Sequence, residues 1–173
     1  MIDVNQTKVK ISAFDGSEPW ETQCADSVED VTLSELADVI CMVPWSPGVF
    51  KNIDFTDSKG NQKHGYRRVK DNLDSIDLVS IDIDEGLTIE EAEEIIRKNG
   101  FFGIVATTRN HRKEKITSGG TVKPPCDRMR AILAAERRMS STEYSATLQK
   151  AFELFPMADA SCKDPSRFYF KCR

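Results

Sequence analysis

The stretch Leu78-Val-Ser-Ile-Asp-Ile-Asp84 predicts a buried β-strand that carries two acids on one face. Side chains alternate along a strand, so Asp82 and Asp84 project to the same side, roughly 7 Å apart, while Ile81 and Ile83 point into a core. Neighbouring carboxylates repel each other and lose hydration unless a cation lies with them. A hard divalent ion such as Mg²⁺ is one such partner, and a solvated strand end is an equally frequent alternative.

The composition limits what the whole chain can be. With 173 residues, 39% of them apolar and 30% charged, it is long enough for one globular domain with its own core. It has no apolar run of about 18 residues and no signal peptide at its start. Its five cysteines are far apart and it has only two histidines, which argues against a zinc site or disulfide scaffold and suits a reducing cytoplasm.

Positive charge is concentrated in one part of the sequence. The segment from Thr108 to Arg138 contains nine Lys or Arg residues and three acids, whereas the whole chain has a net charge of −4. A basic surface on an acidic protein attracts polyanions such as nucleic acid. Charge alone predicts a solvated loop equally well.

From Leu78 onward the pattern predicts an order of elements that is typical of one fold. Capping boxes at Thr88 and Ser140 open helices that run to about Lys98 and Phe155. Strands are expected over 78–84, 101–107, 128–134 and 167–171. The order β-α-β-β-α-β is that of an antiparallel sheet with two helices on one face and its first and third strands in the centre. Asp82 and Asp84 would then lie beside the strand that carries Arg128 and Arg130.

We therefore expect an α/β (α+β) fold in which the 173 residues form a single domain. Residues 78–173 are the core, and residues 1–77 form an N-terminal α/β subregion with a strand over 8–14 and a helix opened by Thr32. Residues 49–75 are polar and turn-rich, with a hairpin tip or loose loop at 57–60. Trp20 and Trp45 are predicted to pack in the core, with stacking on a base as the alternative.

Four motifs in this order resemble the archaeo-eukaryotic primase superfamily, and most closely the primase–polymerase domains of phage and plasmid replication proteins. They are Ser80-Ile-Asp-Ile-Asp84, Thr107-Thr-Arg-Asn-His111, Arg128-Met-Arg130 and Asp159-Ala-Ser-Cys-Lys-Asp-Pro-Ser-Arg167. The resemblance covers about residues 78–171 and implies an RRM-like catalytic core. One position departs from the family pattern, because Arg109 stands where the family has a serine two residues before the histidine.

The resemblance implies a DNA primase or primase–polymerase that joins nucleoside triphosphates on a single-stranded DNA template. Two metal ions, Mg²⁺ or Mn²⁺, would be held by the catalytic acids Asp82, Asp84 and Asp159. Contacts to the nucleotide would come from His111, Arg109, Arg128, Arg130 and Arg167. The resemblance also implies the cytoplasm of a bacterial, archaeal or phage-infected cell, a helicase domain or protein as partner, and no membrane.

The residues themselves leave structural alternatives open. Asp159 precedes a polar turn and could cap it, and Arg167 could pair with Asp159 or Asp164. His111 could be an ordinary residue at a strand end. Two other function classes also remain. A non-catalytic RRM-like module that binds nucleic acid or nucleotides would need exposed aromatic residues on the central strands, where acids and arginines stand instead. The other is a different palm-type nucleotidyltransferase or a nucleotide cyclase.

Overall fold

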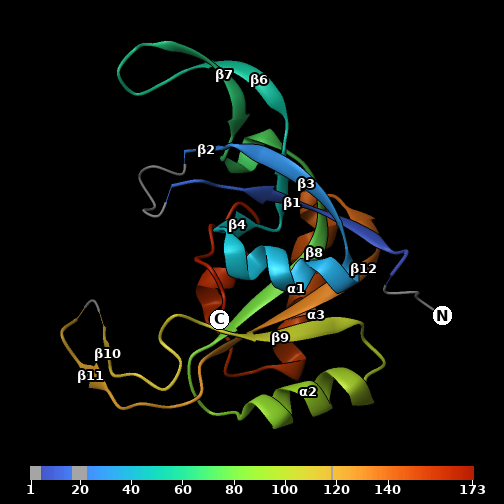
Figure 1. The fold of residues 1–173 in the computed structure, drawn as a ribbon, viewed down its shortest axis with the longest axis vertical. Coiled ribbons are helices and arrows are strands. Elements are labelled where there is room, and N and C mark those ends of the chain that lie inside the picture. The colour runs from blue at the N-terminus through green and yellow to red at the C-terminus, as the bar shows by residue number, and fades with distance from the viewer. Residues whose placement is uncertain (1–4, 17–22, 118) are drawn as a thin grey trace.

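A computed structural model describes residues 5–16, 23–117 and 119–173. Three α-helices and several antiparallel sheets form an α+β fold, as predicted (Figure 1). In chain order the elements are β1 (Lys8–Ala13), β2 (Cys24–Ala25), β3 (Ser27–Thr32), α1 (Leu33–Met42), β4 (Trp45–Ser46), β5 (Gly48–Phe50), β6 (Asn52–Thr56), β7 (Gln62–Arg67), the 3₁₀ turn η1 (Lys70–Asn72), β8 (Leu73–Ile83), α2 (Ile89–Lys98), β9 (Gly103–Thr107), β10 (Lys115–Ile116), β11 (Val122–Lys123), β12 (Met129–Met139), α3 (Ser141–Leu154) and the 3₁₀ turn η2 (Ala160–Lys163).

The central sheet has the strand order β5-β8-β12-β9, and every neighbouring pair in it is antiparallel. The two central strands, β8 and β12, are the first and third strands of the predicted core. Strand β8 begins at Leu73 rather than at Leu78. Its register with β12 places Asp82 directly opposite Arg130. The predicted neighbourhood of acids and arginines is therefore present.

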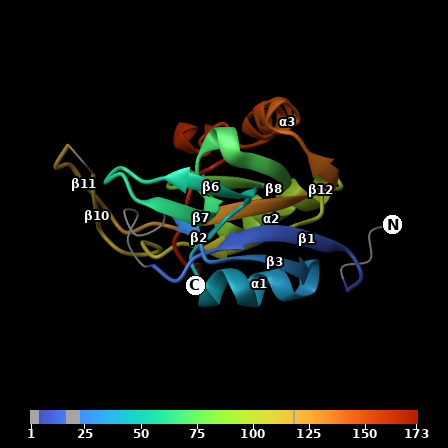
Figure 2. The same ribbon diagram turned by 90° about the horizontal axis from the view of Figure 1, so that it is seen from above.

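Both faces of this sheet are covered, because alternate residues of β8 pack into different cores. Ile81 and Ile83 belong to a cluster with residues of α2 and α3, as predicted for two helices on one face. Leu78 packs on the other face with Ile132 and with residues of β1, β3 and α1. Figure 2 shows α3 and α1 on opposite sides of the sheet. Asp82 and Asp84 project to the same side as Leu78, away from the helices α2 and α3.

The fourth strand of the sheet differs from the prediction. Residues 167–171 form no strand, and β5, from the segment read as turn-rich, lies beside β8 instead. The C-terminal segment makes only an isolated bridge in which Tyr169 pairs with Trp45. The alternation of residues 167–171 is real, since Tyr169 is buried and its neighbours are half-buried, but Tyr169 pairs with Trp45, and it is β5 that pairs with β8, over Leu73–Ile76. Trp45 is fully buried, as predicted, and Trp20 lies outside the described residues.

Local sequence signals set the helix boundaries. Each of the three α-helices begins after a complete capping box, with Thr32, Thr88 and Ser140 as the N-caps. Strands β6 and β7 form the hairpin whose tip was expected at 57–60 (Figure 1). No helix among the described residues is long and apolar enough to cross a membrane.

Candidate functional site at the end of the central strands

Asp82 lies at the centre of a buried group of charges. Its Oδ1 accepts from Arg130 Nε at 2.7 Å, and its Oδ2 accepts from Arg167 Nη2 at 3.1 Å. The Asp82 side chain is 13% exposed and that of Arg130 is 6% exposed. Because a buried carboxylate is costly unless it is paired and hydrogen-bonded, the two arginines offset the cost of burying Asp82 at this depth.

Arg130 is fixed in place by the surrounding aromatic rings. Its guanidinium lies 3.9 Å from the ring centroid of Tyr169 and donates to the Phe170 carbonyl at 3.3 Å. Burial opposes the charge most, but Asp82, Cys172 and Tyr169 together outweigh it, so the pKa of Arg130 is raised. The side chain of Arg130, which was predicted to bind the nucleotide, thus contacts Asp82 and the C-terminal segment instead.

Asp159 is brought next to Asp82 by backbone and side-chain contacts. The Asp159 N–H donates to the Asp82 carbonyl at 2.8 Å, and Arg167 Nη2 lies 3.5 Å from Asp159 Oδ2. The same carboxylate caps the turn η2, accepting from the Ser161 N–H at 2.9 Å. Burial opposes its ionisation, but the hydrogen bonds from Ser161 and the charge of Arg167 lower the pKa of Asp159 overall. Asp159 therefore lies beside Asp82 and also caps the turn η2.

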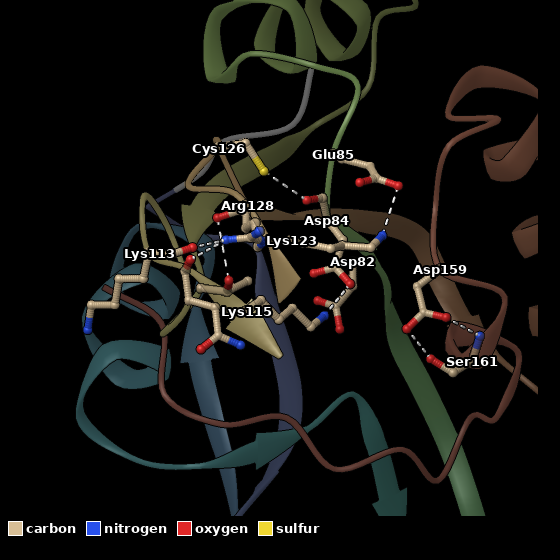
Figure 3. Close-up of polar contacts among 12 residues, drawn as sticks. Asp82, Asp84, Glu85, Lys113, Lys115, Lys123, Cys126, Arg128, Asp159 and Ser161 are labelled. Carbon is tan, nitrogen blue, oxygen red and sulfur yellow. Dashed lines mark hydrogen bonds and ion pairs between the residues drawn. The ribbon is translucent and has the colours of Figure 1, made fainter. Parts of the chain in front are cut away.

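Asp84 follows β8 and faces a different cation (Figure 3). Its Oδ2 accepts from Lys115 Nζ at 2.5 Å, and the adjacent Glu85 pairs with Lys123 at 2.9 Å. Lys115 and Lys123 lie on β10 and β11, the two strands of a short hairpin. The Cys126 thiol donates to the Asp84 carbonyl at 3.3 Å. The side chain of Asp84 is 32% exposed and therefore more open to solvent than that of Asp82.

Arg128 is buried beneath a loop, which its sequence motif did not indicate. Its guanidinium is fully buried and donates to the carbonyls of Asn110, Lys113 and Pro124 at 2.8, 2.5 and 2.8 Å. These carbonyls belong to both arms of the loop that carries the β10–β11 hairpin. Arg128 therefore links the two arms of the loop through hydrogen bonds and does not reach the surface.

His111 and Arg109 lie in the same loop with different exposures. The Arg128 N–H donates to His111 Nδ1 at 3.2 Å, which places the proton of a neutral imidazole on Nε2, 3.8 Å from Asp127 Oδ1. Arg109 is exposed, and its guanidinium lies 3.8 Å from the ring centroid of Phe170. Of the predicted nucleotide-binding residues, Arg109 is the most open to a ligand.

The acids are not grouped into a metal site in this arrangement. Across residues 5–16, 23–117 and 119–173, no three His, Cys, Asp or Glu side chains lie close enough together to hold an ion. Each of Asp82, Asp84 and Asp159 instead has a cationic side chain of the protein against it. Sequence reasoning missed Lys115, Lys123 and Glu85, because the contacts of these residues depend on a hairpin whose strands are only two residues long.

Comparisons with known proteins add one structural likeness. No protein-family profile and no curated protein sequence matches the chain. The fold is similar to that of the polymerase domain of ligase D from Mycobacterium tuberculosis, solved in complex with DNA, with a TM-score of 0.35 and 9% sequence identity. The match covers 95% of this chain and 67% of that chain.

Proposed function

We propose that this chain is a metal-dependent nucleotidyltransferase of the primase–polymerase type, which joins nucleoside triphosphates on a single-stranded DNA template. The observation that carries the proposal is the placement of Asp82 and Asp84 on one face at the end of a central strand, with Arg167, Lys115 and Lys123 around them. Carboxylates among cationic side chains suit a reaction in which metal ions and phosphates meet.

The chemistry of these acids fits Mg²⁺ or Mn²⁺. They supply only oxygen ligands, and Asp84 and Asp159 have partly exposed side chains. Each acid has a cationic side chain of the protein against it, which an ion would have to displace. Asp82, Asp84 and Asp159 would hold the ions, which when bound lower the pKa of the attacking 3′-hydroxyl and neutralise the leaving pyrophosphate.

The chain's own cations would bind and orient the triphosphate. Arg167 is 24% exposed and lies between Asp82 and Asp159, where its planar guanidinium can bind a phosphate by two hydrogen bonds. Arg109 lies exposed on Phe170, and His111 presents its Nε2 from the same loop. Helicase association and a cytoplasmic location belong to the same proposal, because they follow from the resemblance of the motifs.

The covered faces of the sheet argue against the RRM-like binding module. Such a module stacks bases on aromatic side chains of its two central strands. Strands β8 and β12 contain no aromatic residue, and apolar clusters cover both of their faces. A nucleic acid would therefore have to approach the ends of these strands.

A primer-synthesis assay tests the proposal. The protein is incubated with single-stranded DNA, labelled nucleotides and Mg²⁺ or Mn²⁺, beside Asp84→Asn and the matched control Glu85→Gln. Asp84 is chosen because its more exposed side chain makes the substitution less disruptive than one at Asp82. We expect the wild type and Glu85→Gln to form product and Asp84→Asn to lose it by at least about a hundredfold. Equal product from Asp84→Asn, or product without a divalent ion, would contradict the proposal.

A further inference from the structure

The β10–β11 hairpin is held against the body of the protein mainly by charge. Within the part of the chain that the structure describes, its two strands pair only with each other, in the order β10-β11. Ile116 and Val122, which are cross-strand partners, are 72% and 56% exposed. These apolar side chains therefore contribute little packing against the rest of the chain. Figure 1 shows the hairpin projecting from the body beside the ends of the central strands.

Two ion pairs connect this hairpin to the end of β8. Lys115, on the first strand, binds Asp84, and Lys123, on the second, binds Glu85 (Figure 3). The two acids are adjacent in sequence, and Lys115 and Lys123 are cross-strand partners. Both strands of the hairpin are thus fastened to one short acidic segment. Partly exposed ion pairs of this kind are weak and exchangeable.

The base of the hairpin is fixed by a different and stronger arrangement. The buried Arg128 guanidinium holds carbonyls in both arms of the loop, and the Arg112 N–H donates to the Cys126 carbonyl at 2.9 Å. These contacts lie near residues 110–113 and 124–126 and do not involve the hairpin strands. The hairpin can therefore leave Asp84 and Glu85 while its base stays in place.

We propose that Lys115 and Lys123 form a latch that a divalent cation opens by competing with Lys115 for Asp84. The inference rests on the metal site of the proposed function. While the latch is closed, Lys115 occupies the carboxylate that a metal ion would bind. When the ion binds Asp84, Lys115 is released and the hairpin is left with the single, partly exposed pair between Lys123 and Glu85. The hairpin can then move and present both lysines to the phosphates of an incoming nucleotide. No covalent step is involved, since one cation replaces another at a carboxylate.

Metal affinity is the first test. Mn²⁺ binding is measured by calorimetry on the full chain, on Lys115→Met and Lys123→Met, and on Lys113→Met, an exposed lysine of the same loop that serves as the matched control. Removing an intramolecular competitor tightens the apparent affinity by the inverse of the fraction of time the site was open, so we expect roughly three- to tenfold tighter binding in Lys115→Met. Lys123→Met should show a smaller gain, and Lys113→Met should resemble the wild type.

Hydrogen exchange of the hairpin is the second test and reports its position without any catalytic assay. Mn²⁺ should increase amide exchange over residues 114–117 and 119–123 in the wild type, whereas the Lys115→Met/Lys123→Met double variant should exchange rapidly with or without the ion. Mn²⁺ binding that leaves the affinity of Lys115→Met and the exchange of the hairpin unchanged would overturn the latch alone. Absence of Mn²⁺ binding in every variant would overturn the latch and the proposed metal site together.

Discussion

Asp82 and Arg130 face each other across β8 and β12, joined by a 2.7 Å contact between Oδ1 and Nε inside the sheet. Arg167 reaches the second oxygen of the same carboxylate from the C-terminal segment. One acid therefore joins two strands and a segment more than eighty residues away along the chain. This arrangement makes Asp82 a structural centre of the fold as well as a candidate for chemistry.

Replacing Arg130 should destabilise the protein strongly. Arg130→Met leaves the buried Asp82 with one arginine only, and breaking a buried pair costs about 3–5 kcal/mol. Urea unfolding, followed by the fluorescence of the buried Trp45, measures the loss. The control is Arg112→Met, which removes an exposed partner of Asp127 and should cost at most about 1 kcal/mol. Equal unfolding free energies for the two variants would contradict a buried ionic centre.

The stability of the protein should depend on Glu143 in acid. Its hydrogen bond with Arg137 and its place in the capping box of α3 lower its pKa from 4.5 to about 2. A depressed pKa in the folded state means that the stabilisation is present above pH 4.5 and is lost as the pH falls toward 2. Melting temperatures of the wild type should therefore fall more steeply over this range than those of Glu143→Gln. Parallel curves would show that Glu143 makes no such contribution.

Arg128→Lys should loosen the loop that carries His111. Lysine cannot reproduce the donor geometry that holds three carbonyls in two arms of the loop. Hydrogen bonds to a charged group contribute about 1.5–3 kcal/mol each, so exchange of the Arg112 amide should accelerate by at least about tenfold. Amides of β8 provide the internal reference. Unchanged exchange at Arg112 would mean that the loop does not depend on the buried guanidinium.

Gly48→Ala should destabilise the edge of the central sheet. A Cβ at this position would lie 2.6 Å from Leu73 Cδ2 and 2.7 Å from the Pro165 carbonyl oxygen, and the backbone atom cannot easily move. Overpacking of this kind costs about 1–3 kcal/mol. Gly65→Ala, in β7, is the matched control because nothing lies within 4 Å of its added Cβ. Thermal melts should separate the two variants, and identical melting temperatures would refute the close contact.

The sequence predicted best what depends on neighbours along the chain. Capping boxes at Thr88 and Ser140 located α2 and α3, and the alternation from Leu78 onward placed Asp82 and Asp84 on one face. Local hydrogen bonds and the two-residue period of a strand suffice for both predictions.

The errors concern choices between distant segments. The alternation of residues 167–171 is real, but a local pattern does not tell which of two short segments lies beside β8, and β5 takes that place. In the same way, the charges between Thr108 and Arg138 were visible, but not that Arg128 would be buried among carbonyls while Lys115 met Asp84. Such pairings depend on the tertiary fold.

The acids of β8 and the arginines of β12 also limit how the two central strands can align as the protein folds. A slip of one residue would turn Asp82 and Asp84 toward α2 and α3 and expose their isoleucine neighbours. A slip of two residues keeps the apolar pattern, so hydrophobic burial alone would hardly oppose it. One such slip sets Asp82 opposite Ile132 but Arg130 opposite Asp84, and the other sets Arg130 opposite Ser80 but Asp82 opposite Arg128, so each still forms one acid–arginine pair. Of these registers only the native one sets Asp82 opposite Arg130, the pair that Arg167 and Tyr169 also contact, so the C-terminal segment is what distinguishes the native alignment from its two-residue slips.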